Sequence, residues 1–436
     1  MKNAFSGCST VALGVVLAAL PARAQVPHHD LAHVHFCDRT EAMLEDGDAI
    51  RAAREARAWL KRYPRDPDAF VVLGQVALLN GDFRGSLSFL QATYAANPLY
   101  RNVSEPWGDT ARDLLHRYPN LHLHPVTSIE TPQAKKRQAL ATESSNLLVA
   151  RKYDALDQRA NALLRSRLKV GSSWAYTKFA LPLFNGPGDE KGWSANHAHL
   201  EAWHKARPHS LLARIAVARS WTNGAGIARG EGYASTITPQ GSRVMSARLR
   251  RAAPLFQELV PDIGKSPMVF SGLQYFAKLT SMPRNIYFAL FQRADAAFPN
   301  YAPYSLEAAT YLMPRWFGKR GEWERFAAQR ANRLGGARGD ILYADIACDQ
   351  MAYYGNDFPK NTSASYARIK RGLTAATHSG RDPLFDATRA FEQAIIWNDT
   401  AFARHLAAGP LKSHIEGSVL NVSTFNTNRI YAFRSK

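Results

Sequence analysis

Three polar residues of one expected helix, 197–207, have the spacing of metal ligands. His197, Glu201 and His204 stand at positions i, i+4 and i+7, so two imidazoles and a carboxylate share one helical face. A di-metal bundle needs matching groups on other helices, and a zincin needs His-Glu-x-x-His, which this sequence lacks. The three residues stay metal-ligand candidates, and we expect a polar face with hydrogen-bonded histidines.

A second group of candidate ligands lies near the N-terminus, where His33, His35 and Cys37 follow two earlier histidines. Imidazole together with thiolate suits zinc or copper. No other cluster of ligand types is near in the sequence, and a terminal segment can hold histidines that have no structural role. We therefore predict no metal and no cofactor, with these three residues as the alternative.

Arg229, Glu231 and Tyr233 alternate with two glycines and form the best polar candidate for a local binding site. The run GAGIAR before them resembles a dinucleotide-binding fingerprint, but Arg229 occupies the third glycine position and a helix is expected where a strand is needed. Alternatively, the glycines allow close helix approach, and Arg229 pairs with Glu231 or with a helix end.

The catalytic residues are unknown from the sequence. It has no Gly-x-Ser-x-Gly elbow, no phosphate-binding loop and no strong zinc-ligand spacing. Catalytic groups can also come from distant positions, so an enzyme stays an alternative to the non-enzyme that we expect.

The first 24 residues have the features of a secretory signal peptide. Lys2 gives a basic start, residues 11–20 are apolar, and Ala22-Arg23-Ala24 forms an A-x-A cleavage pattern. The apolar run is shorter than the roughly 20 residues that span a bilayer, and no later stretch is apolar enough to do so. We expect cleavage after Ala24 and a periplasmic or secreted protein, with an uncleaved anchor as the alternative.

Export favours disulfide formation. Cleavage removes Cys8 and leaves Cys37 and Cys348 as a candidate disulfide, with two separate buried thiols as the alternative.

The chain is strongly basic, with 55 Lys and Arg against 36 Asp and Glu and a formal net charge of +19. Loss of Lys2 and Arg23 with the leader lowers the net charge to +17. Such a charge could attract an acidic protein, lipopolysaccharide or anionic lipid, although we favour solvated arginine-rich helix faces as its explanation. The basic runs 135–137 and 248–251 are not interleaved with aromatic residues, so we predict no nucleic-acid binding.

Residues 67–98 have the spacing of a helical repeat of 34 residues. Gly47, Asp48 and Pro64 recur 34 residues later as Gly81, Asp82 and Pro98. The other residues at characteristic positions are Phe70, Leu73, Gly74, Ala77, Ser86 and Leu90. The pattern resembles the tetratricopeptide repeat, in which helical hairpins bury their apolar faces by stacking. The resemblance implies an all-α fold, a right-handed solenoid of antiparallel helix pairs.

In tetratricopeptide-like proteins the first helix of each hairpin lines a groove. The matching positions here are Val71, Gln75 and Leu78, which are mostly apolar and unlike the Asn, Lys and Arg of peptide-carboxylate clamps. An apolar groove could hold a partner helix. We keep these residues as binding candidates but expect the chain's own next element to cover them.

Composition and prolines divide the chain into five parts. These are a signal peptide at 1–24, tetratricopeptide-like repeats at 25–119, a connector at 120–140, a helical-repeat domain at 141–412 and an irregular tail at 413–436. In the helical-repeat domain we expect separate helices at 211–221 and 227–237 around a glycine-rich turn.

The central sequence resembles a bacterial family that is known only as a domain of unknown function with tetratricopeptide-like helical pairs. The resemblance covers about 143–355. The stretches that carry it are HLEAWHKARPHSLLARIAVA, ARGEGYA at 228–234 and PNYAPYSLEAATYLMPRWFGKRGEWERFA at 299–327. It implies a helical solenoid and supplies no catalytic residues.

These features indicate an exported helical-repeat protein that binds another protein or acts as a scaffold for complex assembly. One alternative is a cell-envelope hydrolase or sugar-processing enzyme framed by a helical array. A further alternative is binding of an anionic glycan or lipid through a basic face.

Overall fold

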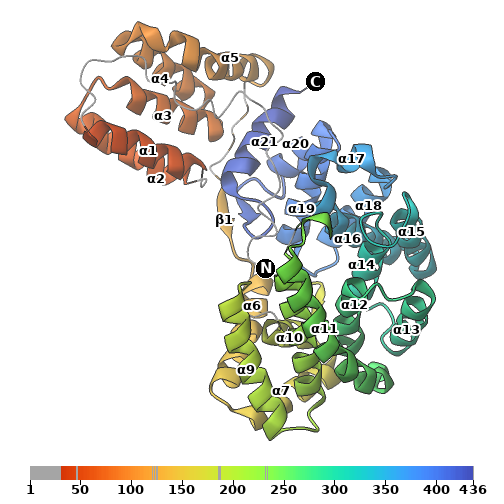
Figure 1. The fold of residues 1–436 in the computed structure, drawn as a ribbon. Helices are drawn as coiled ribbons and strands as arrows, with labels where there is room; N and C mark the ends of the chain where they lie inside the picture. Colours follow the sequence, from red (N-terminus) through yellow and green to blue (C-terminus); the bar gives the residue numbers. More distant parts are fainter. Residues whose placement is uncertain are drawn as a thin grey trace. The chain divides into compact units, whose positions relative to one another are not determined.

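Helices make up nearly all the regular structure in the computed structural model, which describes residues 31–45, 48–119, 121, 123, 126–184, 188–230, 232 and 234–435 (Figure 1). The prediction of an all-α fold is confirmed for these residues. None of their helices combines the length and the apolar character that a bilayer span requires. The described chain divides into two compact units.

The larger unit contains residues 132–354 and 360–382. Its α-helices are α6 (Pro132–Val149), α7 (Tyr153–Ser166), α8 (Ala175–Phe184), α9 (Glu190–Ala206), α10 (Leu211–Arg229), α11 (Pro239–Leu259), α12 (Pro267–Leu279), α13 (Arg284–Ala297), α14 (Ala302–Tyr311), α15 (Glu322–Leu334), α16 (Gly336–Tyr354) and α18 (Tyr366–Thr377). Short antiparallel strands β2 (Lys169–Val170) and β3 (Ser173–Trp174) pair before α8.

The smaller unit combines the described N-terminal residues up to 131 with residues 355–359 and 383–435. Its elements are α1 (Leu31–Glu45), α2 (Ala49–Arg62), α3 (Pro67–Leu79), α4 (Phe83–Ala96), α5 (Arg101–Arg117), β1 (Thr127–Ile129), α19 (Pro383–Ile396), α20 (Thr400–Ala408), β4 (His414–Glu416) and α21 (Val422–Arg434). The short helix α17 (Phe358–Asn361) lies at the boundary between the units.

The C-terminal segment is ordered, so the prediction of an irregular tail from residue 413 is wrong. Strand β4 pairs in parallel with β1, and α21 packs on α3, α5 and α20. The side chain of Asn421 caps α21, and Arg429 is fully buried with its guanidinium 2.6 Å from the carbonyl oxygen of Leu79. Burial lowers the pKa of Arg429 to about 10, so it is still charged at neutral pH. The polar residues of this segment suggested an irregular tail, but in the structure they cap the helix and form contacts with neighbouring elements.

The predicted connector is partly helical as well. Helix α6 begins at Pro132, where proline fits the first helical turn because no intrahelical N–H is needed there. The sequence predicts a connector at 120–140 that includes this proline, and the structure places a helix start there instead. Similarly, the turn expected between 221 and 227 does not exist, because α10 runs without interruption through this segment.

Four of the described helix–helix turns share one geometry. In each, a residue with positive φ ends a helix, and the N–H of the next residue donates to the carbonyl oxygen five residues earlier, which is a Schellman motif. The positive-φ residues are Gly81, Arg151, Ser281 and Asn398, and the bonds are Asp82 to Ala77 (2.8 Å), Lys152 to Leu147 (2.9 Å), Met282 to Ala277 (2.9 Å) and Asp399 to Ala394 (2.7 Å).

The 34-residue sequence repeat is also a repeat of hydrogen bonds. The Asp48 N–H donates to the carbonyl oxygen of Met43 at 2.7 Å, as the Asp82 N–H donates to that of Ala77 at 2.8 Å. The carboxylate of Asp48 caps α2 at 3.0 Å, and that of Asp82 caps α4 at 2.8 Å. Gly47 lies outside the described residues. Equivalent sequence positions therefore form equivalent corners.

Helix α10 is the centre of the larger unit, where it packs against α8, α9, α11 and α12. Its two internal glycines allow close contacts. A Cβ atom on Gly224 would lie 2.4 Å from the Trp193 ring of α9, and one on Gly226 would lie 2.2 Å from the Tyr275 hydroxyl of α12. The glycines that suggested a turn are thus positions of close packing within a helix.

We predict that Gly224→Ala destabilises the protein, although alanine is the better helix former. The new methyl group would displace the Trp193 ring, and overpacking of this kind costs about 1–3 kcal/mol. Urea unfolding would measure the loss. Gly188→Ala is the control, since a Cβ atom there meets nothing within 4 Å. Equal stability of the two variants would contradict the packing argument.

Candidate functional site

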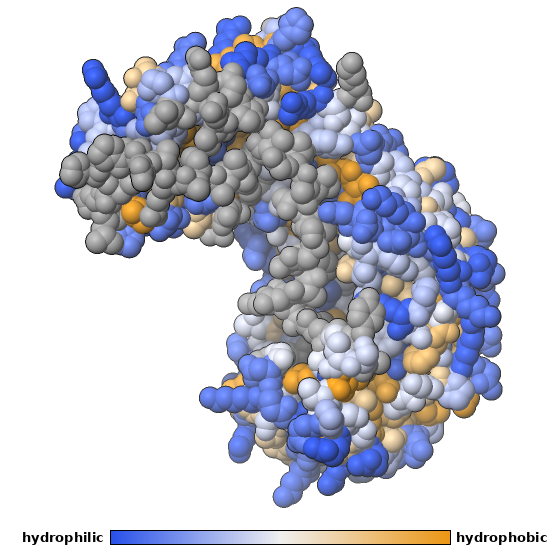
Figure 2. Space-filling view, turned by 45° about the horizontal axis from the view of Figure 1, so that its top comes forward, coloured by the Kyte–Doolittle hydropathy of each residue, from blue (hydrophilic) through white to orange (hydrophobic). Residues whose placement is uncertain are grey.

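Large apolar side chains are exposed only in isolation on the described part of the chain. Ile50, Ile129, Val149, Leu168 and Ile286 lie on five different segments. In Figure 2, hydrophilic residues cover most of the coloured surface and hydrophobic residues form scattered patches. The search for a functional site therefore turns to polar clusters.

The predicted groove residues of α3 do not form an open binding surface. Val71 and Leu78 are 3% and 0% exposed, and only Gln75 is half-buried. Helices α2, α4, α5 and α21 pack against α3 and bury its apolar side chains. The chain's own helices thus cover Val71 and Leu78, which corrects their assignment as binding residues.

His197 and Glu201 meet on α9, but they form part of a packed aromatic cluster. His197 Nδ1 lies 3.0 Å from the Ser220 hydroxyl and Nε2 lies 3.2 Å from the Glu201 carboxylate. The His197 ring stacks on Trp193 and meets Trp221 edge-on. His204 is half-buried, and no convergent set of three ligand atoms forms among the described residues of this helix. The site is a hydrogen-bonded core histidine.

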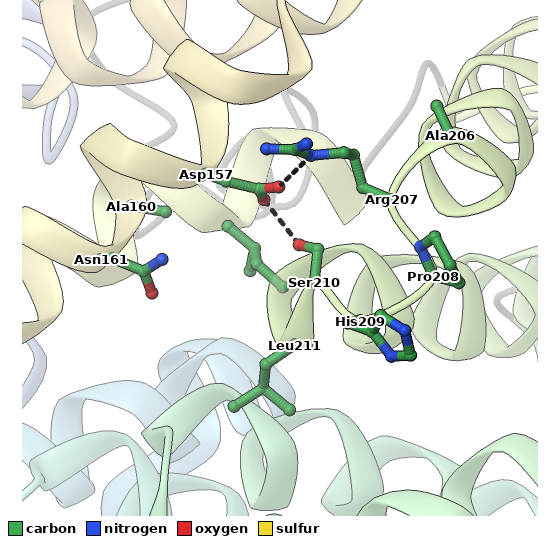
Figure 3. A pocket seen from close by; sticks show the side chains of 10 residues that line it. Asp157, Ala160, Asn161, Ala206, Arg207, Pro208, His209, Ser210 and Leu211 are labelled. Carbon is green, nitrogen blue, oxygen red and sulfur yellow. Dashed lines mark hydrogen bonds and ion pairs between the residues drawn. The ribbon is translucent and has the colours of Figure 1, made fainter.

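A cavity of about 540 Å³ opens where the turn between α9 and α10 faces α7 (Figure 3). The Asp157 carboxylate accepts a 2.5 Å hydrogen bond from Ser210 and lies 3.5 Å from the Arg207 guanidinium. The Ser210 hydroxyl also caps α10. The His209 ring lies away from these interactions (Figure 3). Because Ser210 is engaged on both sides, these contacts fix the turn and leave no activated nucleophile.

The two predicted N-terminal ligands His33 and Cys37 lie together on α1, at i and i+4, and face α3. His35 is exposed and lies outside this group. Cys348 is half-buried on α16. Cys37 belongs to the smaller unit and Cys348 to the larger one, so their pairing stays a prediction.

In the third predicted group, Arg229 belongs to a larger cluster of polar and aromatic residues. Arg229 ends α10, where its guanidinium donates to the carbonyl oxygens of Gly230 and Gly232 and lies 5.4 Å from the Trp316 ring. Glu231 and Tyr233 lie outside the described residues. We define the cationic–aromatic cluster by residues of α10, α12, α14 and the following turn, namely Arg219, Arg229, Tyr275, Lys278, Glu307 and Trp316.

An ion pair between α12 and α14 is central to this cluster. Lys278 Nζ lies 2.7 Å from Glu307 Oε2. The lysine side chain is 6% exposed, whereas that of Glu307 is 41% exposed. Solvent or a ligand can therefore reach the carboxylate side of the pair, while the ammonium group is covered.

Aromatic rings lie next to the cations of the cluster. The Lys278 ammonium lies 5.6 Å from the Trp316 ring and 5.5 Å from the Tyr275 ring. Trp316 thus contacts Lys278 and Arg229, and each cation–π contact stabilises the positive charge by about 0.5–2 kcal/mol. Arg219 packs over Phe184 at 5.3 Å, and its Nε–H has no hydrogen-bond partner among the described residues.

The electrostatics of the cluster keep Lys278, Glu307 and Tyr275 in their ordinary charge states. Burial alone would lower the pKa of Lys278, but Glu307 outweighs burial and raises it. Burial opposes ionisation of Glu307, yet Lys278 and Arg219 hold its pKa below the usual value. Burial raises the pKa of Tyr275 and lowers that of Arg219. Lys278, Glu307 and Tyr275 therefore lack the near-neutral pKa that proton transfer requires.

The arrangement is therefore suited to binding an anion. Lys278 and Arg219 act on one carboxylate, and Arg229 contacts the same Trp316 ring as Lys278. In such partly desolvated surroundings attraction to an opposite charge is stronger than in water. Sequence reasoning missed Lys278, Glu307 and Arg219 because they come from three helices and belong to no local motif. Arg229 was found from its glycine neighbours. Trp316 stood out only as one aromatic of a turn.

No family model matches this chain, and a search of curated proteins finds none that is similar to it. The function must therefore be argued from the chemistry of the site.

We predict that Glu307→Gln destabilises the protein because Lys278 would keep a covered charge without its partner. Breaking a fully buried ion pair costs about 3–5 kcal/mol, and the exposure of Glu307 reduces this to roughly 1–3 kcal/mol. Chemical unfolding would measure the loss. Glu201→Gln, the same change at an exposed position, is the control. If both variants lose an equally small amount of unfolding free energy, the ion pair does not stabilise the protein.

A second prediction concerns pH. Burial lowers the pKa of His197, and Arg248 adds to this while Glu201 opposes it. The unfolded chain therefore binds this proton more readily, so stability is lost as pH falls through the ordinary histidine value near 6.5. We expect the unfolding free energy of His197→Gln to vary less between about pH 7.5 and pH 5 than that of the wild type. His204→Gln should keep the wild-type pH dependence, and a wild-type slope in His197→Gln would refute the assignment.

Proposed function

We propose that this protein is an exported helical-repeat protein that binds a carboxylate-bearing protein partner at the cationic–aromatic cluster and so helps to assemble a complex. The observation that carries the proposal is the charge balance of the cluster. Lys278 and Arg219 act on the carboxylate of Glu307, and Arg229 contacts the same Trp316 ring as Lys278. The three cations outnumber the one carboxylate, and an acidic side chain or a C-terminal carboxylate of a partner would reduce this excess of positive charge.

The chemistry favours binding over catalysis. A general base or nucleophile must lose a proton near neutral pH, but Lys278 and Tyr275 hold theirs more tightly than usual. Glu307 is engaged by Lys278. The net charge of +19 adds long-range attraction for an acidic partner.

The helical fold supports the proposal that the protein acts as a scaffold for complex assembly. The repeated corners at Asp48 and Asp82 and the Schellman turns in both units are what stacked helical hairpins use. On this basis we assign the chain to a tetratricopeptide-like, right-handed solenoid of antiparallel helix pairs. Such solenoids present long surfaces to protein partners. Export to the periplasm after cleavage at Ala24 follows from the leader pattern of the sequence.

A second candidate function is binding of an acidic glycan. Tyr353 at the end of α16 is 42% exposed, and the Arg315 guanidinium lies 5.1 Å from its ring. Lys278 and Glu307 both influence the pKa of Tyr353, which burial raises, so this tyrosine lies beside the cationic–aromatic cluster. An exposed aromatic ring next to a guanidinium suits the apolar face and the carboxylate of an acidic sugar.

We predict that replacing Arg229 and Arg315 by glutamine weakens partner binding by roughly 10²- to 10⁴-fold, since two charged hydrogen bonds are lost and each contributes about 1.5–3 kcal/mol. The mature protein would be immobilised and exposed to bacterial envelope extract at low and high salt. Captured proteins would be identified, and their affinity measured by calorimetry. Binding should weaken with salt.

The matched control is Arg250→Gln with Arg251→Gln, which removes the same charge from the exposed face of α11. Two results would overturn the proposal: equal binding by both double variants, or turnover of a cell-wall substrate that depends on the cluster. Binding of acidic glycans alone, lost in the Arg229 and Arg315 variant, would favour the second candidate.

A further inference from the structure

Four ligand-type side chains from two separate helices come close together in the smaller unit. His33 and Cys37 lie on one face of α1, and Asp66 and Asp68 lie at the start of α3. His33 Nε2 is 3.1 Å from Asp66 Oδ2, 3.1 Å from Asp68 Oδ2 and 4.0 Å from Cys37 Sγ. The ligand atoms of His33, Cys37 and Asp68 all lie within 4.8 Å of one another.

We propose that these side chains form a binding site for a divalent transition-metal ion of the zinc type. His33 Nε2, Cys37 Sγ and Asp68 Oδ2 are the ligands, and Asp66 Oδ2 lies next to them, 3.1 Å from His33 Nε2. With zinc bonds of 2.0–2.3 Å, tetrahedral ligand atoms lie about 3.3–3.7 Å apart. The distances of 3.1–4.0 Å around His33 match this range after small side-chain shifts. Nitrogen and sulfur ligands favour zinc over magnesium or calcium.

Hydrogen bonds around the cluster orient the carboxylates. The Tyr100 hydroxyl donates to Asp68 Oδ1 at 2.9 Å, which leaves Oδ2 directed at His33. Trp59 Nε1–H donates to Asp66 Oδ2 at 3.0 Å, and the N–H of Ala69 donates to Asp66 Oδ1 at 3.0 Å. Metal ligands are commonly held by such outer partners.

The cluster is largely covered from solvent. The side chains of His33, Asp66 and Asp68 are only 15%, 11% and 10% exposed.

A bound metal would fasten α1 to the first turn of α3. This inference does not depend on the proposed function, because the cationic–aromatic cluster belongs to the larger unit. It also bears on the predicted disulfide, since a Cys37 thiolate that binds metal cannot pair with Cys348.

The test uses the untagged mature protein with a phosphine reductant. Zinc binding would be measured by calorimetry, and Co²⁺ would serve as a spectroscopic probe because thiolate ligation adds a charge-transfer band. We expect one metal per chain at the site. Cys37→Ser should abolish the charge-transfer band, and His33→Gln should abolish tight binding.

Tyr100→Phe should weaken binding by about 10–100-fold, as is usual for loss of an outer hydrogen bond. His35→Gln, on the same helix, and Cys348→Ser are the matched controls and should bind as the wild type does. If a ligand variant loses helical circular dichroism, Asp68→Asn replaces it in the comparison.

Two results would overturn the site: no stoichiometric zinc binding by the reduced protein, or binding that is unchanged in both Cys37→Ser and His33→Gln. The latter result would assign the metal to other residues. In either case the contacts of His33 with the two aspartates would be structural only.

Discussion

The close approach of two aromatic side chains to the backbone of α10 is the constraint on which the larger unit depends. Trp193 and Tyr275 pack where Gly224 and Gly226 have no Cβ atoms. This packing holds α9 and α12 tightly against α10, and it therefore sets the separation between Arg219 of α10 and the cations and rings of α12. Glycine weakens an isolated helix. Here the two glycines lower the stability of the helix locally, but they allow a close helix–helix contact that positions the candidate site.

The two polar clusters of the protein contain different kinds of groups. In the cationic–aromatic cluster, Lys278 and Arg219 act on the carboxylate of Glu307 and Arg229 contacts Trp316, so the cluster suits an anion. In the smaller unit, His33 lies beside two carboxylates and the Cys37 thiol, and these ligand types suit a transition-metal ion. Where such groups are covered from solvent, opposite charges attract each other more strongly than in water.

Local turn chemistry explains which part of the helix order was predictable. Gly81-Asp82 could be recognised because glycine readily adopts positive φ and aspartate caps the next helix. Arg151 and Ser281 adopt the same backbone conformation, although residues of these types seldom do so. The packing of the flanking helices holds these turns in place, so the residue types at the turns do not predict them.

The sequence by itself determined the helical class, the 34-residue period, the basic charge and the individual candidates Arg229, His33 and Cys37. These properties follow from composition and from the spacing of residue types along the chain, so they need no knowledge of which helix faces meet. Only the tertiary structure decided that Asp66 and Asp68 meet His33, that Lys278 and Glu307 pair, and that α21 covers α3. Such contacts join residues distant in the chain, and their formation depends on how whole helix faces fit together.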